Sequence, residues 1–499
     1  MTEPAPARHP LLDRLPWLVL IGGMLAFTVT LTRLSRDKAL GLMSEWPLDL
    51  TFFHNIVWNV ANGFGYRQSA TYHEPPGVFN ETHLEPILLL AVPPYMVLPG
   101  LTTLLAVQCG LLALGAVGVY RLARSGGANG WGAAGASLVF LTWWPLWRMA
   151  LADVRPLTWS IPFLLLTAAA LREGRHWETM LWAVLACFSR EEVPLIVAGL
   201  GASAWFWTAP TANGSTPRQR RWLGIRLAGA SVVFLIAANA MRSNVTFYIR
   251  PDEWLAAFLS GDSSDHVEQW GRTPGEMLET RARFLLEWAV PAGFGALLAP
   301  ELLLGALPLF VYLFSQAHEW AGWEGPYIHH SAPAVALVAA AAALGVARAI
   351  SRVPNARARL AVALVLLAGA LVGHRQLLHG YHERVTLAEI EPWQQQHDRV
   401  LELYRLAEQV PADAVVMADY GTVHVFSGRH DVYCYQQEEI ENPRPPDDGP
   451  LREPLLPPAP VQPTWALIHV DHPDWAARSV AAGLREVDRG AEWVLFGPG

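Results

Sequence analysis

Four short polar groups in this sequence could do acid–base chemistry and bind an anion. They are spread along the chain: Glu45 with Asp49, His83 with Glu85, Asp153 with Arg155, and Arg190. A carboxylate can take the proton from an attacking hydroxyl, and cationic side chains can stabilise a departing phosphate. We therefore predict Asp49 and Glu45 as candidate general bases. The candidate phosphate partners are His83, Arg155 and Arg190.

The same residues leave a metal site open. His83 and Glu85 could join Asp49 in holding a divalent cation, because imidazole and carboxylate groups are common metal ligands. Asp153, next to Arg155 in the same turn, is expected to line the same site. The simpler interpretation of each residue alone is a solvated helix cap or an interfacial anchor. All of them flank apolar segments, however, and ionisable groups at membrane depth are costly and tend to mark function.

Three further polar stretches carry weaker expectations. Glu191 and Glu192 are adjacent, so we expect that they do not face one site together. His329 and its neighbour His330 form either an interfacial polar turn or part of the binding site, and His329 is kept as a candidate substrate-binding residue. The stretch 471–474 is predicted to be a turn that starts a helix.

The composition indicates which elements position these groups. Hydrophobic residues make up 52% of the 499 residues and charged residues 16%, whereas soluble domains carry about 25% charged residues. The charges gather in short loops and in the last quarter, with long apolar runs between them, which is typical of a multi-pass membrane protein. A net charge of −8 without a basic stripe argues against a nucleic-acid partner.

Apolar runs predict about eleven helical spans, because a span needs about 20 residues. The predicted spans centre on 15–34, 101–120, 131–150, 156–171, 177–190, 193–208, 222–240, 284–299, 301–316, 331–349 and 359–373. The first follows Arg8 and Arg14 and resembles a signal peptide, but no small-residue cleavage site follows, so we interpret it as a retained span. The run 86–98 is short and rich in proline, which predicts a re-entrant or interfacial helix.

Basic residues predict the orientation. With a cytoplasmic N-terminus, the loops on the cytoplasmic side hold most of the arginines: Arg121, Arg124, Arg172, Arg175, Arg218, Arg220, Arg221, Arg348, Arg352, Arg357 and Arg359. This is the expected positive-inside bias, and counting 86–98 as a full span would destroy it. Arg33, Arg36 and Lys38 lie on the other side and are an exception. The protein is thus expected in the cell membrane, with its C-terminus outside the cytoplasm.

The chain divides into two predicted parts. Residues 1–373 form the membrane part, with a large first extracytoplasmic loop at 35–84. Residues 374–499 form a small extracytoplasmic α/β domain, with strands expected at 414–418, 431–435, 465–470 and 492–496 and a helical stretch at 475–487. The proline-rich stretch 441–463 reads as an extended linker or loop.

Several blocks resemble a bacterial family of multi-pass membrane proteins, domain of unknown function 2079. The block 48–59 matches the family's opening "Asp, aromatic, then Trp", and Gly63 follows it in the expected place. The block 82–95 is similar to its "His, then Pro-Ile-Leu, then Pro-x-Tyr". Gln108 and the stretch 120–124 come next in the expected order. The remaining matches are the turns 153–156 and 189–192 and the tail 410–429.

Two positions depart from the family's pattern. Arg155 stands where the family usually has His, and Arg190 stands where it usually has Lys. Each change keeps a group that can carry positive charge but alters the geometry in which it meets an anion.

The family's architecture is similar to that of the GT-C glycosyltransferases. Those enzymes place a catalytic Asp in the first large extracytoplasmic loop, flank it with re-entrant helices and end in a soluble domain on the same side. Their donors are polyprenyl-phosphate sugars. The resemblance implies that Asp49 is the base and that His83, Glu85, Asp153 and Arg155 line the site.

The sequence therefore favours a GT-C-like fold, mainly α, and a membrane-embedded glycosyltransferase. Its partners would be membrane lipids and a polyprenyl-phosphate-linked sugar, with an acceptor on the extracytoplasmic side and a divalent metal left open as cofactor. The alternative is a non-enzymatic transporter or flippase of lipid-linked glycans, which should show repeats and charges near the bilayer midplane. A third interpretation is a degenerate member that only binds a partner through its tail.

Overall fold

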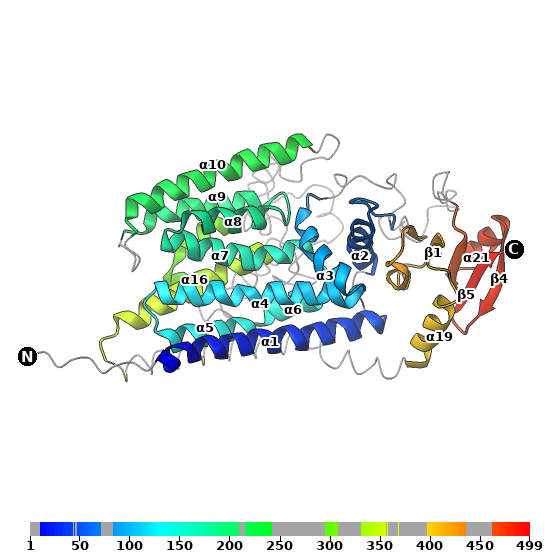
Figure 1. Cartoon of the computed structure of the whole chain (residues 1–499), viewed down its shortest axis with the longest axis horizontal. Helices are drawn as coiled ribbons and strands as arrows, with labels where there is room; N and C mark the ends of the chain where they lie inside the picture. The colour runs from blue at the N-terminus through cyan, green and yellow to red at the C-terminus, as the bar shows by residue number, and fades with distance from the viewer. Residues whose placement is uncertain are drawn as a thin grey trace, which may run out of the picture.

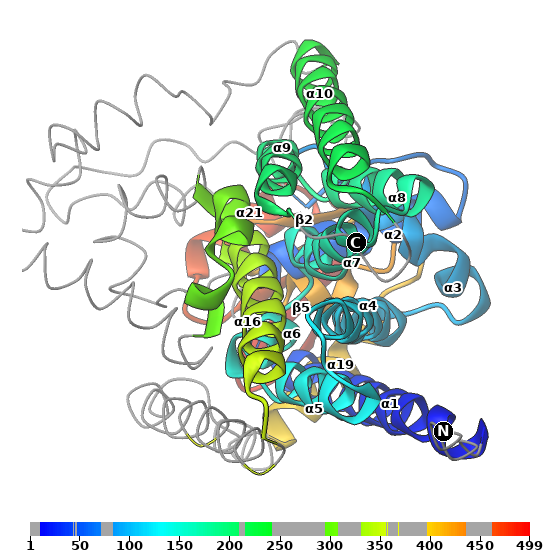
Figure 2. The same cartoon turned by 90° about the vertical axis from the view of Figure 1, so that its left-hand side faces the viewer.

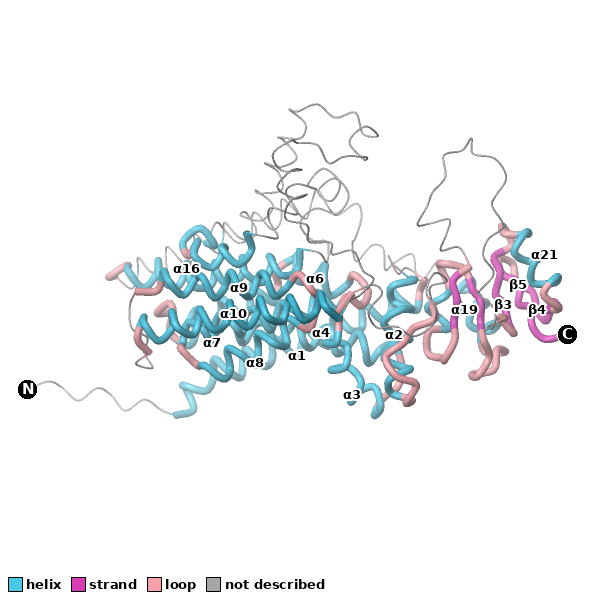
Figure 3. Tube along the Cα trace, turned by 90° about the horizontal axis from the view of Figure 1, so that it is seen from above, coloured by secondary structure: helices cyan, strands magenta, loops and turns pink. Residues whose placement is uncertain are grey.

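The computed structural model of this chain is mostly helical, with one small sheet at its C-terminal end (Figure 1). It describes residues 10–42, 44, 47–70, 83–208, 215–241, 295–307, 331–355, 357, 368, 397–435 and 462–499. The helices run along the long axis of the molecule, and the strands lie at the end opposite to the start of the first helix (Figures 1 and 3).

The helical part contains eleven of the described α-helices: α1 (Pro10–Leu40), α2 (Pro47–Ala61), α3 (Val92–Val97), α4 (Leu101–Ser125), α5 (Gly130–Leu141), α6 (Trp144–Leu151), α7 (Ser160–Glu173), α8 (His176–Cys187), α9 (Val193–Ser203), α10 (Pro217–Met241) and α16 (Ala332–Arg352). Short 3-10 helices join them: η1 (Pro86–Ala91), η2 (Pro156–Trp159), η3 (Ala204–Phe206), η4 (Gly295–Leu298) and η5 (Pro300–Ala306). Their apolar faces form one continuous core.

Four of the described helices are long and apolar enough to cross a membrane: Arg14–Leu40, Leu101–Ser125, Pro217–Ala238 and Ala332–Arg352. They coincide with the spans predicted at 15–34, 101–120, 222–240 and 331–349. Most residues of the spans predicted at 284–299, 301–316 and 359–373 lie outside the described residues, so the total of about eleven stays a prediction.

The span predicted at 131–150 is broken into two helices. Asn129 caps the start of α5, its side-chain oxygen accepting from the Gly132 N–H at 2.8 Å. The α5 helix ends at Leu141, and Pro145 lies in the first turn of α6. Proline is favoured at a helix start and disrupts a helix interior, so one continuous helix through this position is disfavoured.

The segment 86–98 forms two short helices, η1 followed by α3 (Val92–Val97). Together they are roughly 20 Å long at the usual rise of 1.5 to 2 Å per residue, against about 30 Å for the hydrocarbon core. Leu89, Met96 and Val97 are exposed, whereas Tyr95 is buried. The segment is therefore too short to cross the bilayer.

Helix α7 is the central helix of the bundle and leads directly away from the site described below. Its residues from Ser160 to Arg172 are all buried, and it packs against α4, α8 and α16. The contact with α4 is close at Gly118, where an added Cβ would come within 2.8 Å of the Leu165 backbone. Small residues allow such close approach of membrane helices.

The C-terminal part folds into a five-stranded sheet in the order β2-β1-β3-β5-β4. The strands are β1 (Val416–Ala418), β2 (Val432–Cys434), β3 (Trp465–His469), β4 (Leu484–Arg489) and β5 (Trp493–Pro498), with helices α19 (His397–Ala407), η8 (Val423–Phe426) and α21 (Pro473–Ala481). The β2-β1-β3 pairs are parallel, and the β3-β5 and β5-β4 pairs are antiparallel.

The four predicted strands are confirmed within a few residues, and the helical prediction at 475–487 is wrong at its end. Helix α21 stops at Ala481, and residues 484–487 belong to β4. Gly483 follows the helix with a φ of +92°. Glycine in this left-handed conformation ends helices, and the next residues then start a strand.

The C-terminal sheet packs against α2 through buried polar contacts. His54 Nε2 lies 2.9 Å from the Tyr95 hydroxyl of α3, and its Nδ1 lies 2.7 Å from Ser427 Oγ. Asn55 donates to the Arg429 carbonyl at 2.6 Å. Burial, together with the charge of His424, lowers the pKa of His54 to about 4. The imidazole is therefore neutral at physiological pH.

Lys38, one of the three residues of the basic exception in the predicted orientation, has a structural role. Lys38 is buried at the end of α1 and donates to the Leu151 carbonyl at 3.2 Å, and Ser35 donates to the Ala150 carbonyl at 2.9 Å. The next residue, Ala39, accepts from His424 at 2.9 Å. Lys38 thus ties α1 to the end of α6 rather than acting as a free loop charge.

Candidate functional site

The 153–155 turn lies between α6 and η2 and is held by one buried glutamine. Gln108 Oε1 accepts from the Arg155 N–H at 2.8 Å and from Trp159 Nε1 at 3.2 Å. Its Nε2 donates to the Asp153 carbonyl at 2.6 Å. Asp153 has a positive φ of 25°, which is unusual for a residue other than glycine. Gln108 therefore fixes the backbone from which Arg155 extends.

Arg155 forms an ion pair with Asp49, in the first turn of α2. The Arg155 side chain is 8% exposed and the Asp49 side chain 39% exposed. The carboxylate is therefore accessible, whereas the guanidinium is buried beneath it. Asp49 begins a helix, where negative charge is favourable because of the helix dipole.

The 189–192 turn carries a second cation, Arg190, and a second carboxylate, Glu191, and both contact His83. Glu191 is buried and accepts from His83 Nδ1 at 2.9 Å and from the Leu84 N–H at 3.1 Å. Arg190 Nη2 lies 2.6 Å from His83 Nε2, and its Nε lies 3.2 Å from Glu192. Since a guanidinium can only donate, His83 Nε2 accepts and the ring is neutral. Arg190 is the cation of this pair.

Glu85 lies between the two pairs. It is buried, and burial raises the pKa of its carboxyl to about 8. The guanidiniums of Arg190 and Arg155 oppose this shift, and the carboxylates of Glu191 and Glu192 add to it. The charges of both pairs therefore act on the Glu85 carboxyl. At neutral pH this carboxyl is mostly protonated and can donate a hydrogen bond.

The C-terminal part supplies residues that were not predicted. Tyr420 follows β1, and burial raises the pKa of its hydroxyl to about 12, with the negative charge of Asp49 adding to the effect. The charges of Arg155 and Asp153 also act on it. His424, one turn further on, is buried and senses the charge of Asp153. Asp49 and Arg155 are thus close enough to Tyr420 for their charges to act on its hydroxyl.

The structure thus brings together five of the eight candidate residues around two linked pairs, with Asp153 beside them. Asp49 and Arg155 form the first pair, His83 and Arg190 belong to the second, and Glu85 senses both. Glu45 and His329 lie outside the described residues. Glu191 pairs with His83 and Glu192 with Arg190, and the expectation that these two carboxylates do not face one site together stays a prediction.

A metal site finds no support in the described part of the chain, where no group of three or more His, Cys, Asp or Glu side chains could hold an ion. The missed residues are Tyr420 and Gln108. For Gln108 the sequence did carry a signal, because a buried glutamine in an apolar helix must find hydrogen-bond partners. The sequence carried no signal for Tyr420.

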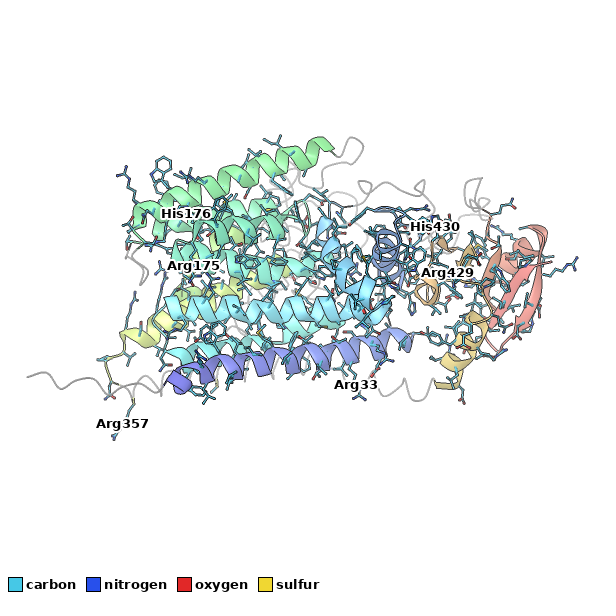
Figure 4. The ribbon with its side chains drawn as sticks, in the orientation of Figure 1. Arg33, Arg175, His176, Arg357, Arg429 and His430 are labelled. Carbon is cyan, nitrogen blue, oxygen red and sulfur yellow. The ribbon has the colours of Figure 1, made fainter. Side chains whose placement is uncertain are left out.

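Helix α2, which carries Asp49, and helix α3 lie at the end of the helical bundle that faces the sheet (Figure 1). Figure 4 shows Arg429 and His430 at that end beside α2, and Arg175, His176 and Arg357 at the other. A helical bundle with four apolar helices of membrane-spanning length and a polar site at one end defines a multi-pass membrane protein. The chain belongs to the family of predicted membrane proteins DUF2079, whose model matches residues 42–446.

No curated protein matches this sequence. Among solved structures, the chain is similar to ArnT from Cupriavidus metallidurans bound to undecaprenyl phosphate, with 13% sequence identity and a TM-score of 0.49. The match covers 95% of this chain and 98% of that one. A TM-score below 0.5 is too low to support an argument, so the proposal below stands on the residues of this chain.

Proposed function

We propose that this protein is a membrane-embedded glycosyltransferase that moves a sugar from a polyprenyl-phosphate donor to an extracytoplasmic acceptor. The observation that carries the proposal is the pair of Asp49 and Arg155. The accessible carboxylate of Asp49 pairs with the buried guanidinium of Arg155 at the end of the helical bundle. This arrangement offers a base to an acceptor from water and a cation to a lipid phosphate from the bilayer.

The proposed step is an inverting displacement. The acceptor hydroxyl attacks the anomeric carbon of the sugar, and the bond between that carbon and the phosphate oxygen breaks. The proton of the hydroxyl goes to Asp49, and the bonding electrons leave with the polyprenyl phosphate. Arg155 and Arg190 balance the charge that develops on the departing phosphate.

The ion pair has to open for this step. Arg155 faces Asp49 in the structure, so a donor phosphate would take the place of the carboxylate on the guanidinium. That exchange frees Asp49 at the moment when the donor is bound. Glu85, protonated at neutral pH because of its raised pKa, can donate a hydrogen bond to the phosphate without repelling it.

The alternative of transport fits the placement of charge less well. On α4 and α16 the ionisable residues lie toward one end of the helix, as Arg121 and Arg124 do on α4 and Arg348 and Arg352 on α16, whereas Arg226 lies near the middle of α10. Transporters place such groups near the middle of the bilayer. An enzyme that works at one surface needs its ionisable groups at that surface, and Asp49, Arg155 and Arg190 lie outside the four apolar helices, which supports the proposal.

The test is transfer of labelled sugar from a polyprenyl-phosphate donor in membranes that contain Asp49→Asn. The substitution keeps size and removes basicity, so the rate should fall roughly 10²–10⁴-fold. Asp37→Asn is the matched control, because Asp37 is a carboxylate that pairs with Arg33 near the end of α1. It should retain the wild-type rate at equal expression.

Two outcomes distinguish a wrong choice of the general base from a wrong proposal of the function. A wild-type rate in Asp49→Asn with loss of transfer in Asp153→Asn or Glu45→Gln would show that another carboxylate is the base. If all three variants still support the protein's function in cells and no transfer is found with the wild type, the glycosyltransferase proposal is wrong and transport or binding replaces it.

A further inference from the structure

Three arginines gather at the end of the bundle far from the candidate site. Arg172 lies in the last turn of α7, Arg220 in the first turn of α10 and Arg348 near the end of α16. We call these three residues the arginine cluster. The described carboxylate among them is Glu301 of η5, and Figure 2 shows α7, α10 and α16 in the bundle seen from this end.

The carboxylate is already engaged. Arg348 Nη1 donates to Glu301 Oε1 at 2.5 Å, and Trp207 Nε1 donates to the same oxygen at 3.2 Å. Arg220 donates to the Trp207 carbonyl at 3.2 Å. Glu301 thus forms its ion pair with Arg348. Among the described residues, the cluster holds three guanidiniums and this one carboxylate, so its charge is positive.

Arg172 is the group that points to a ligand. It is 8% exposed, and its guanidinium lies 5.2 Å over the ring of Trp207. Its Nε and Nη1 have no hydrogen-bond partner in the described chain. The like charges of Arg348 and Arg220 and the opposite charge of Glu301 also act on this guanidinium. Buried donors of a charged group without acceptors are costly, and an anion would supply both acceptor and charge.

The cluster lies at the depth of a membrane interface. Exposed tryptophans surround this end of the bundle at the start of α5, the start of α8, the end of η3 and the start of α10: Trp131, Trp177, Trp205 and Trp222. Indole rings prefer the headgroup region. The side chain of Arg348 is 22% exposed, so the cluster has a polar edge that an anion from this interface can reach.

We propose that the arginine cluster binds a phosphate group, carried by the headgroup of an anionic lipid or by a soluble phosphate. Guanidinium is the preferred protein group for phosphate because its planar N–H fork matches phosphate oxygens. This site is separate from Asp49 and Arg155 and does not depend on the proposed function.

The experiment uses the full-length protein purified in detergent, with its thermal midpoint as the readout. The two probes are phosphatidylglycerol, compared with phosphatidylcholine, and inorganic phosphate, compared with chloride at equal ionic strength. Phosphatidylglycerol alone raising the midpoint assigns the site to a lipid headgroup, and phosphate raising it as well assigns it to the phosphate group itself. No rise with either probe overturns the proposal.

Variants show whether the cluster is responsible. Arg172→Gln should raise the half-saturating concentration of the active probe about tenfold or more, since a hydrogen bond to a charged group is lost. Arg218→Gln is the matched control, because Arg218 is exposed at the same end, and it should change little. An equal effect of both variants would mean general surface attraction and would overturn the proposal.

Glu301→Gln keeps the test decisive if Arg172→Gln does not fold. It removes the negative charge that competes with an anion, so the half-saturating concentration should fall severalfold, even though the ion pair with Arg348 is lost. Unchanged or weaker binding in this variant would show that the cluster is an internal ion-pair network.

Discussion

Glu85 gives a prediction whose size follows from the structure. Its carboxyl is buried, and its pKa rises from 4.5 to about 8. The folded protein therefore binds this proton more tightly than the unfolded chain does. The stabilisation from this proton is fully present below pH 4.5 and is lost as the pH rises through 8. The rise in pKa from 4.5 to about 8 corresponds to roughly 5 kcal/mol of stabilisation.

Glu85→Gln replaces the protonated acid by a neutral amide of the same shape. The thermal midpoint of the wild type, followed by tryptophan fluorescence in detergent, should fall by several degrees between pH 5 and pH 9 because of this group. The variant should lose most of that slope. Glu408→Gln, at an exposed carboxylate of the C-terminal part, serves as the control and should keep the wild-type slope. Parallel slopes in Glu85→Gln and the wild type would refute the argument that Glu85 is protonated in the folded protein.

Three further predictions concern the orientation and the framework of the site. A reporter active only in the periplasm should work when fused after Gly499, and activity of a cytoplasm-only reporter there would reverse the predicted orientation. His54 has its pKa lowered to about 4, so the folded protein should lose up to roughly 3 kcal/mol as the pH falls from 6.5 to 4, measured as the midpoint difference from His54→Gln. Gln108→Ala removes hydrogen bonds to Arg155, Asp153 and Trp159 and should cost about 1–3 kcal/mol, lowering both the thermal midpoint and sugar transfer.

The sequence predicted those parts of the fold that depend on local pattern. Long apolar runs predicted the four spanning helices, a short apolar run predicted β1 and an alternating stretch predicted β2, and strands were also expected near β3 and β5. It failed where a single residue interrupts a pattern. Pro145 breaks the predicted span at 131–150, and Gly483 ends α21 before the stretch that becomes β4.

The site was predictable to the extent that charge at the end of an apolar helix is informative. Asp49, Arg155 and Arg190 were found in that way, because such groups are costly at membrane depth. Their pairing was not predictable, since it depends on how distant turns meet. The adjacent Glu191 and Glu192 illustrate this: on a tight turn they take different partners, His83 and Arg190, yet both act on Glu85.

The C-terminal sheet is part of the site's framework rather than an appendage. Residues 67–70 of the first loop lie along β2, where the Cys434 N–H donates to the Ala70 carbonyl at 3.2 Å and the Val432 N–H donates to Ser69 Oγ at 2.9 Å. Arg67 closes the contact with Asp431 at 2.8 Å. The same loop begins with α2 and its Asp49. Because the loop that carries the candidate base covers an open strand edge, the position of that base depends on the sheet.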